Sequence, residues 1–426
     1  MKRILGVLMS IILVASLCGC GKNESATSSD IVEVIYEEET IYEGGSAMSN
    51  TIDETISSEL DSSYNECVSS DNVNTSSDNT SSETAENKLL LNDSKVLEKI
   101  KLNGRTQKTK EGIVLDYTAS AIEFNTNSSS VLLQIEADAG VYYSVFVDDE
   151  LKTARGVTEQ GVNFIVLARG LQGGQHNIKF VRSTEGRSYN SMTAVYLQLD
   201  EGKELVDSAK NDSGVLIEFL GDSMTSGYGN LIESGSNNVS DFKYEDSLNA
   251  YPYLVASKLG FDYRIISMSG IALKERKINT TTYPTFYDFY KLENYYKDKS
   301  TLYTSSNPQD VDIVVVNLGT NDAANKTLSK NDGEMIAKYI DIYTNLITKI
   351  GYAKDTKIVF ISGIMWCHDQ LPAYNGAKDK LNALGYNNVY VYDIPTYRTD
   401  GNHPSVKDHK DIAEKITKFF KEKGVV

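Results

Sequence analysis

The sequence contains few of the residues that cross-link a chain or bind a metal. Its 426 residues include four cysteines, four histidines and one tryptophan. Cys18 and Cys20 lie near the N-terminus, which leaves only Cys67 and Cys367 for the rest of the chain. One disulfide between these two would not amount to a stabilising framework, and no cysteine or histidine pair has the spacing of a zinc site. The sequence therefore predicts no metal and no cofactor.

Basic residues are missing from one long segment. Between Asn23 and Asn87 there are 16 acidic residues and no lysine or arginine. The segment is rich in serine, asparagine and threonine, a composition that cannot bury enough apolar surface to fold. We therefore expect residues 21–88 to form a disordered acidic stalk. Residues 88–426 carry a net charge of only −4, which gives no indication of a nucleic-acid partner.

The N-terminus has an apolar run that is short for a membrane span. The run ILGVLMSIILVAS follows Lys2 and Arg3 and leads into Leu17-Cys18-Gly19-Cys20. This pattern resembles the lipobox of bacterial lipoproteins, in which the cysteine after a small residue is lipidated. The resemblance implies a signal peptide over 1–20, acylation at Cys20, and a lipid anchor on the extracellular face of the bacterial cell membrane. The alternative is an ordinary secretory signal with two incidental cysteines.

Short alternating runs fill residues 89–203. The stretches AIEFNT at 121–126, SVLLQIEA at 130–137 and HNIKFVRS at 176–183 alternate apolar and polar side chains. Such alternation is typical of strands that bury one face, and Gly, Asn, Asp and Ser punctuate the runs. No helical periodicity is visible here. The segment is therefore predicted to be an all-β jelly-roll sandwich.

From residue 210 onward, apolar strands alternate with helical patterns. The five candidate strands contain the runs VLIEFLG, DYRIIS, DIVVVN, TKIVFI and NVYVYDI, and the helical patterns cover 250–260, 334–351, 372–385 and 405–424. Each helical pattern ends near a glycine, which is a common helix stop. Short, uniformly apolar strands fit a parallel sheet that is buried on both faces. Residues 210–426 are therefore predicted to form an α/β/α domain with a five-stranded parallel sheet.

Polar residues follow four of these five strands. They are GDS at 221–223, Gly270, GTND at 319–322 and DGNH at 400–403. The carboxyl ends of parallel strands meet at one edge of a sheet, where ligands bind in such folds. A hydroxyl, a base, an acid and amide donors are the groups that acyl transfer needs. The sequence thus predicts an acyl-transfer site at this edge.

The order GDS, Gly, GTND and DGNH resembles the four sequence blocks of the SGNH (GDSL-like) hydrolase superfamily. This resemblance covers residues 210–426, and the GTND and DGNH elements make it specific. In the preceding segment, YYSVFVDDE and ARGLQGGQHNIKFVRSTEG are similar to carbohydrate esterase family 2, so that this second resemblance covers about 90–426. Members of that family join a jelly roll to an SGNH domain and remove acetyl groups from plant polysaccharides.

The resemblance implies a role for each matching residue. Ser223 would attack the ester carbonyl, and His403 would take its proton and later return it to the leaving hydroxyl. Asp400 would hold the imidazole tautomer; some family members use a backbone carbonyl instead, in which case Asp400 would only shape its loop. The backbone amides of Ser223 and Gly270, with the side-chain amide of Asn321, would form the oxyanion hole.

The other histidines are weaker candidates for the base. His176 is expected in a sandwich turn and His409 on the solvated side of the last helix. His368 follows the fourth strand and is therefore the only rival to His403.

Aromatic residues near the predicted site are candidates for substrate contact. Trp366 falls just past the fourth strand, where its ring would stack on a sugar or pack into the core. Tyr228, in the segment after Ser223, is a second candidate. The tyrosine-rich segment 274–306 is long for a connection, which fits either a lid or a small helix packed on the core.

Together, these patterns predict a surface-anchored serine esterase that removes O-acetyl groups from hemicellulose-type polysaccharides or oligosaccharides such as xylan and mannan. One alternative is an SGNH esterase that acts on lipid, thioester or O-acetylated cell-wall glycan. The other is a carbohydrate-binding lipoprotein with a vestigial site. The sandwich would either bind glycan itself or pack against the hydrolase domain and frame the active-site cleft.

Overall fold

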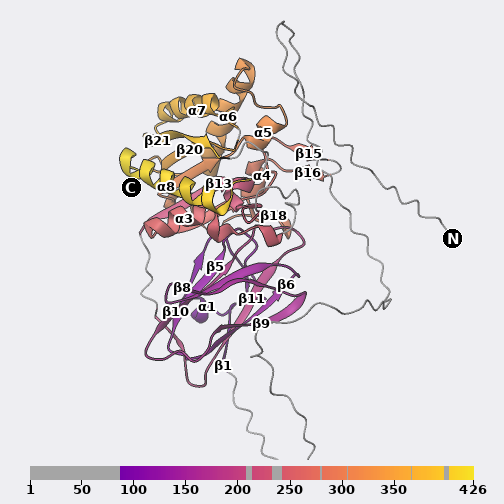
Figure 1. Cartoon of the computed structure of the whole chain (residues 1–426), viewed down its shortest axis with the longest axis vertical. Helices are drawn as coiled ribbons and strands as arrows, with labels where there is room; N and C mark the ends of the chain where they lie inside the picture. The colour runs from indigo at the N-terminus through magenta and orange to yellow at the C-terminus, as the bar shows by residue number, and fades with distance from the viewer. Residues whose placement is uncertain are drawn as a thin grey trace, which may run out of the picture. The chain divides into compact units, whose positions relative to one another are not determined.

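The computed structural model describes residues 87–207, 214–232, 242–278, 281–304, 306–365, 367–397 and 403–426. The predicted signal peptide lies outside these ranges, as does the predicted stalk up to residue 86. All described residues fall in one compact unit. Figure 1 shows an indigo-to-magenta part that is built of strands and an orange-to-yellow part in which strands and helices alternate.

The N-terminal part consists of two antiparallel sheets. The first has the order β3 (Gln107–Lys108), β4 (Ile113–Val114), β11 (Met192–Leu199), β6 (Val131–Ala137) and β9 (Gly161–Ala168), with β1 (Asn87–Leu90) paired to β11. The second has the order β12 (Leu205–Val206), β5 (Ala121–Thr126), β10 (His176–Arg182), β7 (Tyr142–Val147) and β8 (Glu150–Val157), with β2 (Ile100–Asn103) paired to β5.

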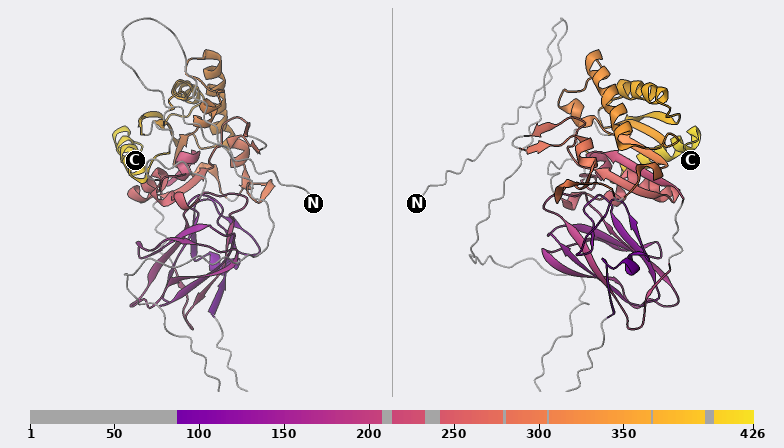
Figure 2. Two further views of the ribbon diagram at one scale, coloured as in Figure 1. Left: turned by 45° about the vertical axis from the view of Figure 1, so that its right-hand side comes forward. Right: turned by 180° about the vertical axis from the view of Figure 1, so that it is seen from behind.

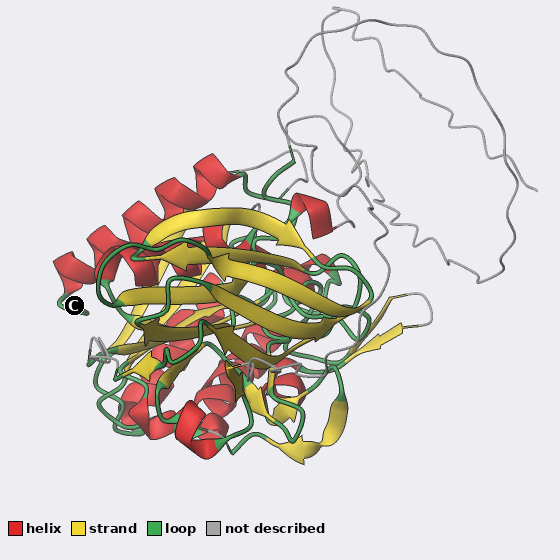
Figure 3. Cartoon of the chain, turned by 90° about the horizontal axis from the view of Figure 1, so that it is seen from below, coloured by secondary structure: helices red, strands yellow, loops and turns green. Residues whose placement is uncertain are grey.

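Alternation along these strands builds a single apolar core. Phe124 on β5, Leu133 on β6 and Phe180 on β10 are fully buried members of one cluster to which both sheets contribute. Within 87–207 the only helix is the single turn α1 (Ser94–Leu97). The longer helices all belong to the C-terminal part. Figure 3 views the molecule from below, with strands across the centre and helices around them. The predicted β-sandwich is confirmed.

The C-terminal part is organised by one five-stranded sheet. Its order is β14 (Asp262–Ser267), β13 (Leu216–Gly221), β19 (Ile313–Asn317), β20 (Lys357–Ile364) and β21 (Val389–Thr396). All neighbouring strands run parallel, as the apolar runs predicted. The predicted α/β/α class is confirmed.

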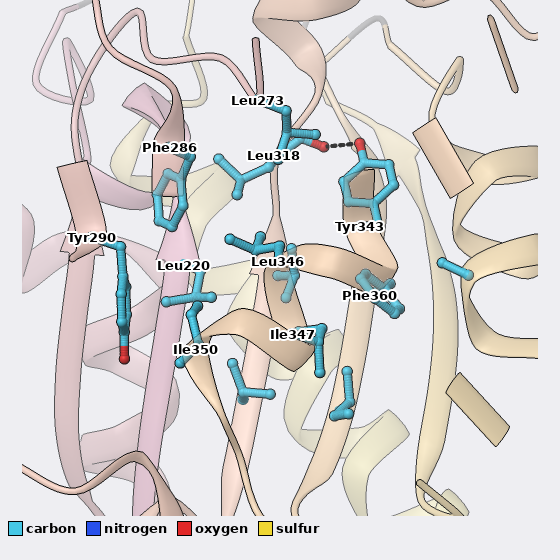
Figure 4. Packing of buried hydrophobic residues seen from close by; sticks show 14 of the residues in the cluster. Leu220, Leu273, Phe286, Tyr290, Leu318, Tyr343, Leu346, Ile347, Ile350 and Phe360 are labelled. Atoms are coloured by element: carbon cyan, nitrogen blue, oxygen red, sulfur yellow. Dashed lines mark hydrogen bonds between the residues drawn. The ribbon is translucent and has the colours of Figure 1, made fainter. Parts of the chain in front are cut away.

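Helices cover both faces of this sheet. On one face, α6 (Gly333–Ile350) and α7 (Leu371–Ala383) pack over side chains such as Leu220 and Phe360, as Figure 4 shows in part. On the other face, α3 (Tyr251–Leu259) and α8 (Val406–Lys423) pack over Phe219 and its neighbours. Because adjacent strand residues point to opposite faces, Phe219 and Leu220 enter different cores. Figure 2 shows α8 with the C-terminus from two further sides.

Glycines end three of the four longer helices as the sequence predicted, and a capping box begins one of them. Gly260, Gly351 and Gly424 are left-handed C-caps of α3, α6 and α8. Ser405 and Asp408 form a capping box at the start of α8. No helix within the described residues is long and apolar enough to cross a membrane.

Short elements occupy the connections. They are α2 (Ser223–Ser226), η1 (Phe242–Tyr244), η2 (Ser247–Asn249), η3 (Pro308–Asp310), α5 (Thr320–Ala324), the hairpins β15 (Arg276–Ile278)/β16 (Thr281–Tyr283) and β17 (Leu292–Asn294)/β18 (Asp298–Leu302), and α4 (Phe286–Tyr290). The tyrosine-rich segment therefore contains a small helix, and Phe286, Phe289 and Tyr290 of that helix are buried in the core. Of the two predicted readings, the packed helix holds for this stretch.

Candidate active site

The GDS segment lies where β13 turns into the one-turn helix α2. Asp222 is the N-cap of this helix, since its Oδ1 accepts a hydrogen bond from the amide of Met224 at 3.2 Å. Gly221 is required because a Cβ at this position would lie 1.8 Å from Thr225 Oγ1. Ser223 is partly exposed, while the residues on either side of it are buried. The capping role thus belongs to Asp222, and the Ser223 hydroxyl is left for chemistry.

Ser223 and His403 are in direct contact. Ser223 Oγ lies 2.7 Å from His403 Nε2, although the two residues are 180 positions apart in the sequence. The Tyr228 ring packs edge-on against the imidazole, with 5.0 Å between ring centroids. A hydroxyl at hydrogen-bond distance from an imidazole nitrogen can pass its proton to that nitrogen as it attacks a carbonyl carbon.

Burial governs the protonation states around this pair. It lowers the pKa of His403 to about 4, while the negative charge of Glu185 acts in the opposite direction. Burial also raises the pKa of Tyr228 to about 12 and that of Asp222 to about 7. At neutral pH His403 is therefore uncharged, which is the form of imidazole that can accept a proton.

The loop after β14 brings a second group of polar atoms to the site. Gly270 has a φ of 82°, in the left-handed region that glycine adopts without strain. Asn321, near the start of α5, donates from Nδ2 to the carbonyl of Ile271 at 2.9 Å and to Asp222 Oδ2 at 3.4 Å. Neither the amide of Ser223 nor that of Gly270 donates a hydrogen bond to another described residue. These two amides are therefore donors that an oxyanion can use. Asn321 Nδ2 can join them by giving up its 3.4 Å contact with Asp222 Oδ2.

Arg276 on β15 supports this loop and was missed by the sequence analysis. Its Nη1 donates to Asn321 Oδ1 at 2.9 Å and to the carbonyl of Gly270 at 3.1 Å. One guanidinium therefore orients both the Asn321 amide and the Gly270 peptide. A single arginine in a polar segment carries no local pattern that would have indicated this role.

Asp322, next to Asn321, has a structural role. Its Oδ2 accepts a hydrogen bond from the amide of Leu273 at 3.0 Å, and its Oδ1 accepts one from the Tyr339 hydroxyl at 2.6 Å. The carboxylate is fully buried. It fastens the loop after β14 to α5 and α6, and it does not contact Ser223 or His403.

The other histidines have different partners. His368 Nδ1 lies 2.7 Å from Asp393 Oδ1 and its Nε2 lies 2.9 Å from Thr396 Oγ1, so the rival base is engaged away from Ser223. His176 is the first residue of β10 and not part of a turn, and its Nδ1 lies 2.7 Å from Asp148 Oδ2.

The expectation that His409 is solvated was wrong. The side chain is fully buried, and its Nδ1 accepts a hydrogen bond from the amide of Tyr251 at 3.2 Å. His409 lies one helical turn before Ile412 and Ala413, on the face of α8 that packs against α3. Helical spacing therefore places it in the core despite its polarity.

Three predicted functional residues lie outside the described residues. They are Asp400, Trp366 and Cys20. Cys367 is buried and free. Within the described ranges, no cluster of histidine, cysteine and carboxylate side chains has the makeup of a metal site.

The contact between Ser223 and His403 predicts a reactive serine with an unusual pH dependence. An organofluorophosphonate should label Ser223, and the labelling rate should stay constant down to about pH 5 and fall to half near pH 4, because His403 must be neutral. The measurement is the labelling rate against pH, with peptide mapping of the adduct. His403→Gln serves as the unreactive control, and circular dichroism at each pH reports on folding. Half-maximal labelling near pH 6.5, the ordinary histidine pKa, would contradict this account of the buried imidazole.

Comparisons with known protein families agree with this architecture. Residues 102–208 match the family described as carbohydrate esterase 2 N-terminal, and residues 217–416 match the GDSL-like lipase/acylhydrolase family. Cellulase/esterase CelE of Acetivibrio thermocellus is 26% identical over 322 residues, which cover 72% of this chain and 37% of that protein. Acetylxylan esterase/glucomannan deacetylase of Cellvibrio japonicus is 26% identical over 270 residues, which cover 58% of this chain and 67% of that protein.

Solved structures share the fold. A family two carbohydrate esterase from Clostridium thermocellum, determined in complex with cellohexaose, superposes with a TM-score of 0.66 at 24% identity and covers 77% of this chain and 100% of its own. The acetyl xylan esterase Est2A from Butyrivibrio proteoclasticus superposes with the same TM-score of 0.66 at 18% identity, covering 80% of this chain and 100% of its own. The chain spans little more than a third of CelE, at 37%. The chain thus combines a segment that matches the carbohydrate esterase 2 N-terminal family with one that matches the GDSL-like hydrolase family, and it resembles the carbohydrate esterases of family 2.

Proposed function

We propose that this protein is a serine esterase that removes O-acetyl groups from hemicellulose-type polysaccharides or oligosaccharides through an acyl-enzyme intermediate. The observation that carries the proposal is the 2.7 Å contact between Ser223 Oγ and His403 Nε2. The matches to the two family domains support the choice of a carbohydrate ester as substrate. No cofactor enters the reaction.

The reaction begins with attack of Ser223 Oγ on the acetyl carbonyl carbon. His403 Nε2 takes the hydroxyl proton, and the carbonyl oxygen becomes an oxyanion that accepts hydrogen bonds from the amides of Ser223 and Gly270 and from Asn321 Nδ2. The tetrahedral intermediate collapses, the bond to the sugar oxygen breaks, and His403 returns its proton to that oxygen. Water then attacks the carbonyl carbon of the acetylated Ser223 while His403 Nε2 takes a proton from it. The bond to Ser223 Oγ breaks, His403 returns the proton to Oγ, and acetate leaves.

Asp400 is proposed to complete the triad by accepting a hydrogen bond from His403 Nδ1. Such a contact would keep the proton on Nδ1, so that Nε2 faces Ser223 with its lone pair. It would also stabilise the imidazolium that forms in each step. The alternative is a dyad in which a backbone carbonyl accepts the Nδ1 proton.

Aromatic side chains around Ser223 are proposed to contact the sugar. Tyr228 lies against the His403 ring, and Tyr189 on the sandwich loop is 66% exposed and close enough to influence the pKa of Tyr228. Tyr189 also faces Phe242, with 6.2 Å between ring centroids. Exposed aromatic rings beside an ester site suit the apolar faces of pyranose rings. Trp366, which the sequence places just past the fourth strand, stays a predicted sugar contact.

The proposed activity predicts that the purified protein releases acetate from acetylated xylo- or manno-oligosaccharides. Ser223→Ala should abolish the release, because a methyl group cannot form the acyl-enzyme. Acetate would be measured enzymatically, with Ser257→Ala, an exposed serine of α3, as the matched control that retains activity. Acetate release by Ser223→Ala at the native rate would overturn the assignment.

The same assay separates the alternatives. A preference for long acyl chains over acetyl would favour a lipid or thioester substrate, and turnover restricted to intact O-acetylated cell-wall glycan would favour that polymer. Glycan binding without hydrolysis, together with failure of the fluorophosphonate to label Ser223, would favour a vestigial site. The close Ser223–His403 contact argues against this last possibility.

Replacing Asp400 distinguishes the triad from the dyad. If Asp400 orients His403, Asp400→Asn should lower kcat by about 10⁴-fold with little change in KM, since the wrong tautomer would be held. The measurement is steady-state hydrolysis of 4-nitrophenyl acetate, with Asp393→Asn as a control for a carboxylate that contacts a different histidine. A loss below about tenfold would point to the dyad.

We further propose that Cys20 carries lipid and anchors the protein to the extracellular face of the cell membrane. Full-length protein expressed in a bacterium should then fractionate with membranes, and Cys20→Ser should move it to the soluble secreted fraction. Cys18→Ser is the matched control and should leave the protein with the membranes. Equal fractionation of all three proteins would remove the lipoprotein assignment and leave an ordinary secretory signal.

A further inference from the structure

Glu185 is a buried carboxylate of the β-sandwich that reaches the active site. It lies in the loop between β10 and β11, and the side chain has no exposed surface. A carboxylate without access to water is costly unless hydrogen-bond donors and a positive charge surround it. Two of the donors around Glu185 come from the segments that carry Ser223 and Gly270.

Two donors meet on the same oxygen of Glu185. Its Oε2 accepts a hydrogen bond from Ser226 Oγ at 3.0 Å and from the amide of Ser269 at 2.7 Å. Ser226 belongs to α2, the one-turn helix that begins with Ser223, and Ser269 directly precedes Gly270. One oxygen atom of the sandwich therefore joins α2 to residues 268–272 after β14, which hold the proposed oxyanion donor Gly270 and are called the oxyanion loop below.

A chain of hydroxyl groups extends this connection. Thr118 Oγ1 lies 2.9 Å from Ser267 Oγ, which lies 2.9 Å from Ser226 Oγ. A hydroxyl has a single hydrogen, and a carboxylate can only accept. Ser226 Oγ is the donor toward Ser267 Oγ as well as toward Glu185 Oε2, so these two acceptors share its one hydrogen. Both ends of the chain, Thr118 and Glu185, belong to the sandwich.

Further contacts fix Glu185 on the side that faces away from Ser226 and Ser269. The second oxygen of Glu185, Oε1, forms an ion pair with the Arg187 guanidinium. The fully buried Arg182 donates from Nη2 to the Glu185 carbonyl at 2.7 Å and from Nη1 to the Asn190 carbonyl at 2.8 Å. The amide of Glu185 donates to the Glu245 carboxylate. The carboxylate is thus fixed before any substrate arrives.

We propose that Glu185 is a positioning residue of the esterase, through which the sandwich sets the geometry between Ser223 and the Gly270 amide. The hydrogen bond from the Ser269 amide fixes the Met268–Ser269 peptide, directly before the peptide that carries the Gly270 amide. Gly270 has a φ of 82°, which few other residues adopt without strain. The hydrogen bond from Ser226 fixes the rotation of α2 about its own axis. An oxyanion donor must lie within a few tenths of an ångström of its place to lower the barrier. The two hydrogen bonds that Glu185 Oε2 accepts, here called the clamp, therefore affect kcat more than KM. The inference rests on the proposed esterase function.

The test compares truncations of two buried charges that both cross from the sandwich to the hydrolase domain. Glu185→Ala removes the clamp. Arg105→Ala is the matched control: Arg105 is 1% exposed and donates to the carbonyls of Tyr290 and Leu292, at 2.8 and 3.3 Å, which are not part of the site. Each full-length variant is assayed for kcat and KM with 4-nitrophenyl acetate, for the rate of fluorophosphonate labelling, and for its melting temperature.

We expect Glu185→Ala to lower kcat and the labelling rate by about 10²-fold, the loss typical of one misplaced oxyanion donor, with KM within about twofold of the native value. Arg105→Ala should keep kcat within about threefold of the native value, even if its melting temperature falls as far as that of Glu185→Ala. The double variant Glu185→Gln/Arg187→Gln keeps an oxygen for Ser226 and Ser269 without leaving Arg187 unpaired, and it should recover most of the lost turnover. A folded Glu185→Ala with native kcat, or equal losses in Glu185→Ala and Arg105→Ala, would overturn the proposal.

A milder variant keeps the test decisive if Glu185→Ala does not fold. Ser226→Ala removes one of the two donors, and it should lower kcat by about three- to tenfold at unchanged KM. Native kcat in this variant, or no recovery in the double variant, counts against the clamp. Failure of the proposed function has a separate signature. Native protein that hydrolyses 4-nitrophenyl acetate but releases no acetate from oligosaccharides refutes the substrate and leaves the clamp testable, whereas native protein inert to both reagents refutes both proposals.

Discussion

The parallel sheet, apolar on both of its faces, is the constraint on which the site depends. Ser223 follows β13 and His403 precedes α8, and only the stacking of helices on both faces of the sheet brings these distant segments within 2.7 Å. Val314 and Val316 enter one core, whereas Ile313 and Val315 enter the other, so a one-residue slip of β19 would send each set into the core that is packed for the other. The positions of the site residues therefore depend on that register.

The oxyanion loop is the least regular part of the site and is correspondingly well tied. Glu185 binds the Ser269 amide, Arg276 binds the Gly270 carbonyl, and Asn321 binds the Ile271 carbonyl. Three consecutive residues are therefore held by side chains from three different parts of the chain. A loop outside helix and sheet has no ladder of its own, and side-chain partners must replace it. Rigidity is useful here because preorganised donors need no reorganisation during the reaction.

The sequence was informative where the physics is local. Uniformly apolar runs marked the five parallel strands, and glycines marked the ends of α3, α6 and α8, because strand burial and helix capping depend on near neighbours in the chain. The contact of Ser223 with His403 was predictable because both sites follow strands whose ends share one edge. Glu185 was not predictable, since its partners lie 41 and 84 residues away in another domain. His409 was misjudged because polarity was weighed above its helical spacing from Ile412.

The buried charges between sandwich and hydrolase domain explain why the two domains form one unit. Arg105 and Glu185 are almost wholly without solvent, and a truncated hydrolase domain would lose the partners of Ser269, Ser226, Tyr290 and Leu292. Water would replace these partners, and a hydrogen bond to a charged group such as Arg105 or Glu185 contributes about 1.5–3 kcal/mol relative to one with water. Several such losses together reach the size of a typical domain's net stability, about 5–15 kcal/mol. A sandwich that supplies these partners therefore does more than frame the cleft. It completes the hydrogen bonding of the segments that carry the proposed oxyanion donors, and this dependence gives a physical reason for the two domains to occur together in one chain.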